Sequence, residues 1–131
     1  MNDTAPINEP QGNLQLRTLA MPADANPAGD IFGGWVLSQM DIAGGIAASE
    51  KAQGRVATVA VEAMQFHRPV HIGDVLCVYS RIRRIGNTSI AVQLDAWALR
   101  ERIGKREMVT EGIFTFVALG EDGKPRQVRK D

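Results

Sequence analysis

The sequence predicts an α+β fold in which one long antiparallel β-sheet curls around a single helix. Two observations support this fold class. Residues 31–51 contain no proline and place apolar side chains at helical spacing, and the four long segments that follow Gly54 are rich in β-branched and aromatic residues. A long sheet beside one apolar helix buries both apolar surfaces when the sheet wraps around the helix. The length of 131 residues suits one domain.

The chain begins with a polar segment, residues 1–13, which we expect to be a disordered tail. The folded domain is predicted to span residues 14–119, and the charged ending, 120–131, is predicted to trail over the surface. Within the domain, the apolar stretch 14–19 predicts the first strand. A loop with two prolines follows and leads into the helix.

The helix is predicted to cover residues 31–51. Its apolar residues fall at intervals of four and three positions: Val36, Met40, Ala43 and Ala47. Between residues 31 and 49 the only ionisable side chain is that of Asp41. A surface helix would carry a charged face, whereas this one is apolar or small nearly all round, so we expect it to be buried. Gly44 and Gly45 each cost about 1 kcal/mol relative to alanine, so we expect another backbone or a ligand to approach them closely.

Four strands are predicted after the helix, each bounded by turn residues: 55–68, 74–85, 88–101 and 105–119. The three short connections between them predict hairpins and therefore an antiparallel sheet. Both faces of the last strand are apolar. Alternate positions divide its residues into two sets: Val109, Ile113 and Val117, and Met108, Phe114 and Phe116. An apolar outer face suggests cover by a partner, so we expect a homodimer at least.

Composition and charge exclude several classes of protein. The chain carries 15 basic and 15 acidic residues, whereas a nucleic-acid-binding protein would show a basic excess. It has no charged start followed by an apolar run, as a secretory signal would, and no stretch of the roughly 18 apolar residues of a membrane span. Cys77 is the only cysteine, so no intrachain disulfide can form. We therefore expect a cytoplasmic protein with neither a nucleic-acid nor a membrane partner.

Asp41 is the first candidate catalytic residue. A lone carboxylate on a buried helix is costly unless it is paired or hydrogen-bonded, and such groups can serve as general bases. The alternative is a structural aspartate that bonds to nearby backbone or faces a solvent channel. Gly33 and Gly34 stand at the helix start, where free N–H groups and the helix dipole favour a developing oxyanion. The alternative there is a simple junction of loop and helix.

Other catalytic and ligand-binding motifs are missing from the sequence. It holds no G-x-S-x-G, no G-x-x-x-x-G-K-[ST] and no G-x-G-x-x-G after a strand. His67 and His71 lie in a strand-to-turn region without further metal-ligand spacing, so we expect no metal. Thioester hydrolysis suits one carboxylate and an oxyanion site, because a thiol with a pKa of roughly 8.5 leaves without a strong acid behind it.

The segment from Asn26 to Gly34 reads N-x-x-G-x-x-x-G-G and is followed on the helix by Met40-Asp41. Further distinctive segments extend from about residue 14 to residue 126: Leu16–Pro22, Asp24–Asn26, Val59–Glu62, Arg68–Val70, Gly73–Val75, Thr88–Ser89 and Gly123–Arg126. Together they closely resemble the YciA-type bacterial acyl-CoA thioesterases, over nearly the whole chain.

The resemblance implies a hotdog fold and hydrolysis of acyl-CoA to a free acid and CoA, with no cofactor. It also implies dimers with active sites at their interface, and we expect a trimer-of-dimers hexamer. The family's catalytic aspartate matches Asp41, as a general base or alternatively as a nucleophile. The family's loop asparagine matches Asn26, which would orient the water or the thioester. The N–H of Gly33 or Gly34 would hold the carbonyl oxygen.

Residues that bind the CoA portion are expected among basic and hydroxyl side chains near the site, because CoA carries several phosphates. The candidates of this kind are Arg68, Arg81, Arg83, Thr88 and Ser89, and the aromatic Phe32 beside the helix start is a further candidate for binding the substrate. The alternative for each arginine is a solvated charged surface. Pro27 and His67 depart from the family pattern. Pro27 would restrict Asn26 to extended conformations, and either departure could shift acyl preference or turnover.

Two other functions remain as alternatives on the same fold. A non-catalytic acyl-CoA-binding module would have no need of both Asp41 and Asn26. A dehydratase acting on a hydroxyacyl thioester normally uses a histidine with a carboxylate partner, and His67 and His71 lie outside the helix start. Thioester hydrolysis is therefore the favoured hypothesis.

Overall fold

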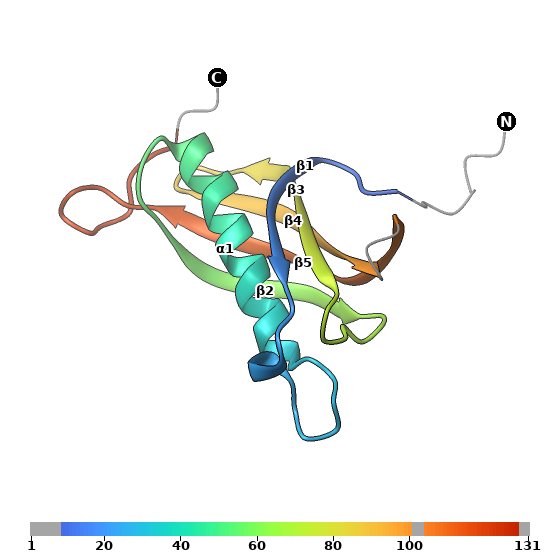
Figure 1. Cartoon of the computed structure of the whole chain (residues 1–131). Helices are drawn as coiled ribbons and strands as arrows, with labels where there is room; N and C mark the ends of the chain where they lie inside the picture. The colour runs from blue at the N-terminus through green and yellow to red at the C-terminus, as the bar shows by residue number, and fades with distance from the viewer. Residues whose placement is uncertain (1–8, 101–103, 129–131) are drawn as a thin grey trace, which may run out of the picture.

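The computed structural model describes residues 9–100 and 104–128, and Figure 1 shows one long helix crossing a strongly curved sheet. The elements in chain order are β1 (Asn13–Leu19), a short 3-10 helix η1 (Pro22–Asp24), α1 (Gly33–Ala52), β2 (Val56–Phe66), β3 (Val75–Ile85), β4 (Ser89–Arg100) and β5 (Lys105–Ala118). The sequence therefore predicted the helix and every strand to within two residues at either end. The predicted α+β class, with one sheet around one helix, is confirmed.

The five strands form one antiparallel sheet in the order β1-β3-β4-β5-β2. Two of the three predicted hairpins are present, β3–β4 and β4–β5. The third prediction was wrong, because β2 pairs with β5 and not with β3. The connection 67–74 closes no tight turn between its strands. Its backbone bonds instead to the segment before α1, from Ile31 N to Val70 O at 3.0 Å, and to the end of β1, from Gly73 N to Ala20 O at 2.8 Å.

The helix α1 lies on the concave side of the sheet and contacts all five strands. Small residues dominate its buried face: Val36, Met40, Ala43, Gly44, Ala47, Ala48 and Ala52. The helix ends where Gln53 adopts a left-handed conformation with φ of 55°. There Arg126 donates from Nη2 to the carbonyl oxygen of Ala52 at 2.6 Å. A cation stabilises this end of a helix, because the last carbonyl groups carry partial negative charge.

The prediction that α1 is buried was wrong for part of its surface in a single chain. Ile42 is 53% exposed and Ile46 is 45% exposed. Both lie on the part of the helix surface that the sheet does not cover. The absence of charge on this side of α1 therefore has another cause than burial within one chain.

The core lies between α1 and the concave face of the sheet. On β4 every second residue is fully buried: Ile90, Val92, Leu94, Ala96 and Ala98. On β5 the rings of Phe114 and Phe116 stack with their centres 6.4 Å apart. A Cβ atom at Gly44 would lie 2.7 Å from the Phe116 ring and 2.8 Å from Leu94 Cδ1. Two side chains therefore make Gly44 necessary, rather than the backbone or ligand that we expected.

Val109 lies on the other face of β5 from the one that the sequence predicted. The pairing of β4 with β5 shifts after Ala96, so that Ala96 faces Thr110 while Trp97 faces Met108. This bulge brings Val109 into the core, where it is fully buried, and leaves Met108 on the outer face. Sequence alternation cannot locate a bulge, because one extra residue reverses every face beyond it.

The segment after β5 packs against the domain. Leu119 bridges to Pro125, and Val128 donates its N–H to Asn87 O at 2.7 Å. The side chain of Val128 belongs to the hydrophobic core. The expectation that the ending trails over the surface therefore fails for residues 124–128. Residues 1–8 of the expected disordered tail, and residues 129–131, lie outside the described residues.

Candidate active site

Asp41 lies partly buried in the middle of α1, within reach of β2. Its Oδ1 accepts a hydrogen bond from Thr58 Oγ1 at 2.6 Å. Thr58 points to the concave face because it pairs with the core residue Phe116. In the described part of the chain Oδ2 of Asp41 has no hydrogen-bond donor. One carboxylate oxygen is therefore fixed, and the other is open to accept a proton from water.

Sequence reasoning missed Thr58. A threonine that follows Asp41 by 17 positions in a predicted strand gives no signal of its own. Its contact with Asp41 depends on which face of β2 it occupies, and that face follows from the pairing of β2 with β5. The sequence alone singled out Asp41, whereas only the structure reveals the hydroxyl group that holds it.

The start of α1 has no side-chain cap. Trp35 and Val36 donate their N–H groups to Phe32 O at 3.1 and 3.4 Å. The N–H groups of the exposed Gly33 and Gly34 have no acceptor among residues 9–100 and 104–128. A Cβ atom at Gly34 would meet nothing within 4 Å. Free N–H groups at the positive end of the helix dipole can bind an oxygen that becomes anionic.

A cavity of about 290 Å³ opens beside this helix start. Apolar side chains form most of its wall: Ile31, Val36, Phe66, Pro69 and Val70. Gly33, His67, Arg68 and Thr110 complete the lining. An apolar space next to free amides suits a molecule that carries a carbonyl group beside an apolar chain.

Asn26 stands at the start of the loop 26–30, which precedes α1. Its Oδ1 accepts hydrogen bonds from Ala28 N at 3.0 Å and Asp30 N at 3.1 Å. Its backbone N–H donates to Asp30 O at 2.7 Å. The oxygen of the side chain therefore holds the loop together. Its Nδ2 makes no hydrogen bond to the described residues and is free to donate to a ligand.

Pro27 fits this loop well. Gly29 donates its N–H to Asn26 O at 2.9 Å, which closes a turn with Pro27 at its second position. The φ of Gly29 is 96°, a conformation that favours glycine. Proline is favoured at the second position because its fixed φ matches the turn. This departure from the family pattern therefore stabilises the turn that carries Asn26.

Phe32 and Arg68 lie at the same end of the molecule as the free amides. Phe32 directly precedes α1 and is 51% exposed. Arg68 lines the cavity beside Gly33 and donates from Nη1 to Met108 O at 2.7 Å. Its Nε lies 3.6 Å from Glu107 Oε2, and half of the side chain is exposed. Both residues are therefore accessible to a ligand that enters at the helix start.

Glu107 is held by two arginines. A hydrogen bond from Arg100 is the main reason why the pKa of Glu107 lies below its ordinary value. Desolvation opposes this effect, and the positive charges of Arg100, Arg68 and Lys105 reinforce it. The carboxylate of Glu107 therefore helps to fix Arg68 at the edge of the cavity.

Thr88 and Ser89 lie at the other end of the molecule. They belong to the hairpin between β3 and β4, where Ala118 donates its N–H to Thr88 O at 2.9 Å. Ser89 begins β4 and its backbone oxygen accepts from Gly86 N at 2.8 Å. Because this is the end at which α1 finishes, one chain does not bring these hydroxyls to Asp41.

Arg81 and Arg83 lie on the outer face of the sheet, opposite to α1. Arg81 Nη2 is 3.4 Å from Asp95 Oδ2, and Arg83 Nη1 donates to Gln93 Oε1 at 3.0 Å. Gln93 Nε2 in turn donates to Asp95 Oδ1 at 2.9 Å. Within one chain these arginines stabilise buried polar groups of the sheet, and the sheet itself separates them from Asp41.

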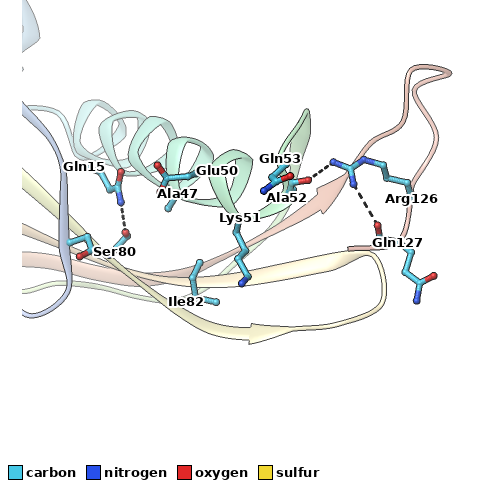
Figure 2. A pocket seen from close by; sticks show the side chains of 11 residues that line it. Gln15, Ala47, Glu50, Lys51, Ala52, Gln53, Ser80, Ile82, Arg126 and Gln127 are labelled. Carbon is cyan, nitrogen blue, oxygen red and sulfur yellow. Dashed lines mark hydrogen bonds between the residues drawn. The ribbon is translucent and has the colours of Figure 1, made fainter. Parts of the chain in front are cut away.

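A larger cavity, of about 660 Å³, lies at the C-terminal end of α1 (Figure 2). Its walls come from α1, β1, β3 and the segment that contains Arg126. Lys51 in this cavity is ten positions beyond Asp41, or about 15 Å along the helix. The cavity opens beside β1 and β3, whereas Asp41 contacts β2 at the opposite edge of the sheet. It is therefore separate from the space around Asp41.

The candidate site borders an uncovered apolar surface. This surface consists of exposed residues of α1 and of the β2 edge: Ile42, Ile46, Val59, Val61 and Phe66. Ile42 adjoins Asp41 in the chain, and the ring of Phe66 lies against Gly33. Apolar side chains beside a free strand edge favour association with another chain. In a single chain, the candidate site is therefore exposed on the side of this apolar surface.

The described residues form neither a metal-binding cluster nor a membrane-spanning helix. Among residues 9–100 and 104–128, no three His, Cys, Asp or Glu side chains gather into a group that could hold a metal ion. Within the same ranges, no helix is long and apolar enough to span a membrane. Cys77 is unpaired and buried in β3, as expected of a packed thiol.

The curved sheet, the central helix with a single carboxylate in its middle and the free amides at its start define a thioesterase of the hotdog fold. Residues 28–105 match the family model of the thioesterase superfamily, and the chain belongs to that superfamily. Among particular relatives, the acyl-CoA thioester hydrolase YciA of Salmonella typhimurium is 57% identical, over 91% of this chain and 92% of the relative. The YciA protein of Escherichia coli is 55% identical with the same coverage.

Solved structures agree with this assignment. The crystal structure of a hexameric thioesterase from Yersinia pestis superposes with a TM-score of 0.89 and is 51% identical. The match covers 94% of this chain and 100% of that chain. A hexameric hotdog-fold thioesterase of Campylobacter jejuni gives a TM-score of 0.85 at 41% identity, over 91% and 92% of the two chains. The resemblance to the YciA-type thioesterases and the hotdog fold are therefore confirmed.

Proposed function

We propose that this chain is an acyl-CoA thioesterase that hydrolyses acyl-CoA to a carboxylic acid and CoA. The observation that carries the proposal is Asp41, whose Oδ1 is fixed by Thr58 while Oδ2 is open. The free amides of Gly33 and Gly34 supply the second requirement, a site for the carbonyl oxygen. Support also comes from relatives that share more than half of their residues with this chain and are acyl-CoA thioester hydrolases.

In the proposed reaction Asp41 takes a proton from water while the water oxygen attacks the thioester carbon. The carbonyl oxygen becomes negative and accepts hydrogen bonds from the N–H of Gly33 or Gly34. The C–S bond then breaks and CoA leaves as a thiolate, which takes up the proton. Asn26 orients the water or the thioester through Nδ2. Direct attack by Asp41, through a mixed anhydride that water then cleaves, is the alternative.

The proposed reaction uses no cofactor, because the thiol of CoA is a good leaving group. Phe32 and Arg68 border the helix start and are the candidates to contact the CoA arm there. Thr88, Ser89, Arg81 and Arg83 lie away from Asp41 within one chain, so their contact with CoA depends on a neighbouring copy. The proposal includes a cytoplasmic location, and the unpaired Cys77 fits a reducing compartment.

The working site is proposed to lie between two copies that join along β2. Pairing of the two β2 edges would merge the sheets and cover the apolar surface around Ile42 and Val59. It would also bring Asp41 of one copy toward the helix start of the other. Three such dimers would form a hexamer, the assembly of the Yersinia pestis relative.

The first test measures thiol release from a panel of acyl-CoAs with short, long and aromatic acyl groups. The wild-type chain should release thiol, and Asp41→Ala should lower the rate at least about a hundredfold, as removal of a general base predicts. Ser38→Ala is the matched control, because Ser38 is exposed on the same helix and bonds only to Trp35 O within the described residues. The control should keep the wild-type rate.

Three other outcomes would count against the proposal. Equal release by wild type and Asp41→Ala would place the chemistry at another residue. Tight binding of acyl-CoA without release would indicate a binding module. An enoyl product without release would indicate a dehydratase, for which His67, hydrogen-bonded to Glu111 at 2.8 Å, offers the histidine–carboxylate pair.

A further inference from the structure

Arg100, at the end of β4, is the nearly buried centre of an ionic cluster. Only 12% of its side chain is exposed. Its Nη1 pairs with Asp74, its Nε lies 2.8 Å from Glu107 Oε1, and its Nη2 donates to Pro69 O at 3.0 Å. All three nitrogen atoms of the guanidinium group are therefore engaged, which fixes its orientation.

Asp74, the main partner of Arg100, shapes the connection 67–74. Its side chain is 8% exposed, and Oδ2 also accepts the N–H of His71 at 2.9 Å. His71 Nδ1 lies 3.3 Å from Arg100 Nη1, and since arginine can only donate, Nδ1 is the acceptor. Arg100 and Asp74 thus hold both ends of the segment from Pro69 to His71 in one conformation.

This segment in turn holds the loop 26–30. Ile31 donates its N–H to Val70 O at 3.0 Å, and Asp30 forms a backbone bridge with His71. Asp30 is also the residue whose N–H and C=O both bond to Asn26. A path of hydrogen bonds and adjacent residues therefore leads from Arg100 through Asp74 to His71, crosses from Val70 to Ile31, and continues from Asp30 to Asn26.

We infer that Arg100 and Asp74 are positioning residues for Asn26, which they hold in place beside the helix start through the segment 69–71. The inference rests on the proposed function, because Asn26 needs a fixed place only if its Nδ2 serves the reaction. Neither Arg100 nor Asp74 has to touch the substrate. A misplacement of about 1 Å by a distant substitution can lower a rate about a hundredfold.

The kinetic test compares Arg100→Gln, Asp74→Asn and Arg100→Lys with the wild-type enzyme. Arg100→Gln and Asp74→Asn should lower kcat for acyl-CoA about 10- to 100-fold and leave KM within about threefold, because only the orientation of a group used in the transition state is lost. Arg100→Lys keeps the positive charge but loses the planar guanidinium group and its several donors. Its kcat should therefore lie between those of Arg100→Gln and the wild type. Arg17→Gln, at an exposed arginine of β1, is the control and should behave as wild type.

A double substitution separates positioning from general destabilisation. If Arg100 acts through Asn26, Arg100→Gln should change kcat less than about threefold when Asn26→Ala is already present. Full additivity of the two effects would overturn the inference. So would an unchanged kcat in Arg100→Gln.

Hydrogen exchange provides a readout that does not depend on catalysis. The amides of Ala28 and Asp30, which bond to Asn26 Oδ1, should exchange at least about tenfold faster in Arg100→Gln, while those of β4 keep their protection. Equal loss of protection in both places would show a purely structural role and refute the inference. If wild type releases no thiol, the proposed function fails, and the exchange experiment still decides whether Arg100 holds the loop.

Discussion

At the scale of single residues, the side chains of Asp41 and Asn26 share one property: each is fixed at one atom and free at another. Thr58 holds Oδ1 of Asp41, and the amides of Ala28 and Asp30 hold Oδ1 of Asn26. A side chain that is already fixed loses little conformational entropy when a ligand binds. If the two groups act as proposed, they are already fixed before the substrate binds.

The residues that the sequence identified are those whose chemistry is visible locally. Asp41 stood out as the lone charge on an apolar helix, and Gly33 and Gly34 as adjacent glycines at its start. Thr58 and Arg100 did not stand out, because their importance comes from contacts with residues 17 and 26 positions away. Nothing in the local pattern specifies such a contact until the pairing of the strands is known.

Glu107 gives a prediction for the pH dependence of stability. Because the folded chain lowers its pKa below the ordinary 4.5, chiefly through the hydrogen bond from Arg100, its contribution to stability is fully present above that value. The contribution is lost as the pH falls from about 4.5 through the lowered pKa. In chemical denaturation, the difference in stability between wild type and Glu107→Gln should therefore shrink as the pH falls below about 4.5.

The control for this prediction is Glu121→Gln, at an exposed carboxyl group of the turn after β5. It should follow the wild-type curve throughout the titration. A constant difference between wild type and Glu107→Gln across the whole range would show that Arg100 does not stabilise the ionised form.

At the scale of elements, the sequence predicted what each segment is but not where it sits in the sheet. Periodicity predicts whether a segment is a helix or a strand and which of its side chains share a face. It does not predict which strand pairs with β2, because that depends on the connection 67–74. Two local irregularities escaped prediction for a related reason. The bulge at Val109 and the packing of Val128 into the core both depend on neighbours that are distant in the chain.

The contact between α1 and β5 leads to a stability prediction. Gly44→Ala should destabilise the fold by about 1–3 kcal/mol, because its Cβ would overlap the buried Phe116 ring and Leu94. Gly45→Ala is the matched control: its Cβ would make only an ordinary contact with Phe116 at 4.0 Å, and alanine favours the helix by up to about 1 kcal/mol. Denaturant unfolding should show a lower free energy of unfolding for Gly44→Ala and a higher one for Gly45→Ala. Equal changes would contradict the close packing of Gly44 against Phe116 and Leu94.

At the scale of the whole molecule, one edge of the sheet accounts for several features at once. The uncharged outer side of α1 and the exposed apolar residues of β2 both belong to the uncovered surface that borders the candidate site. The sequence suggested a partner from the last strand, but the exposed surface is on α1 and β2. Only the strand order reveals this, because it makes β2 an edge.

Assembly and activity should therefore be lost together. Val59→Lys places a charge on the β2 edge at a position that is exposed in a single chain, so the fold should survive while association weakens. Light scattering should show a smaller species, and thiol release should fall in parallel. Leu14→Lys, at an exposed position on β1, is the control and should preserve the dimer. A fully active monomer would contradict a site shared between copies.

The strand order also has a consequence for the chain while it is being synthesised. β2 leaves the ribosome directly after α1, but among the strands that the structure describes it pairs with β5 alone, the last of them to be made. During the synthesis of β3 and β4, an apolar strand with two unpaired edges is thus exposed. Such segments favour premature association between nascent chains. The strand that would join finished copies is therefore also the one that most needs shielding, for example by a chaperone, until translation of β5 is complete.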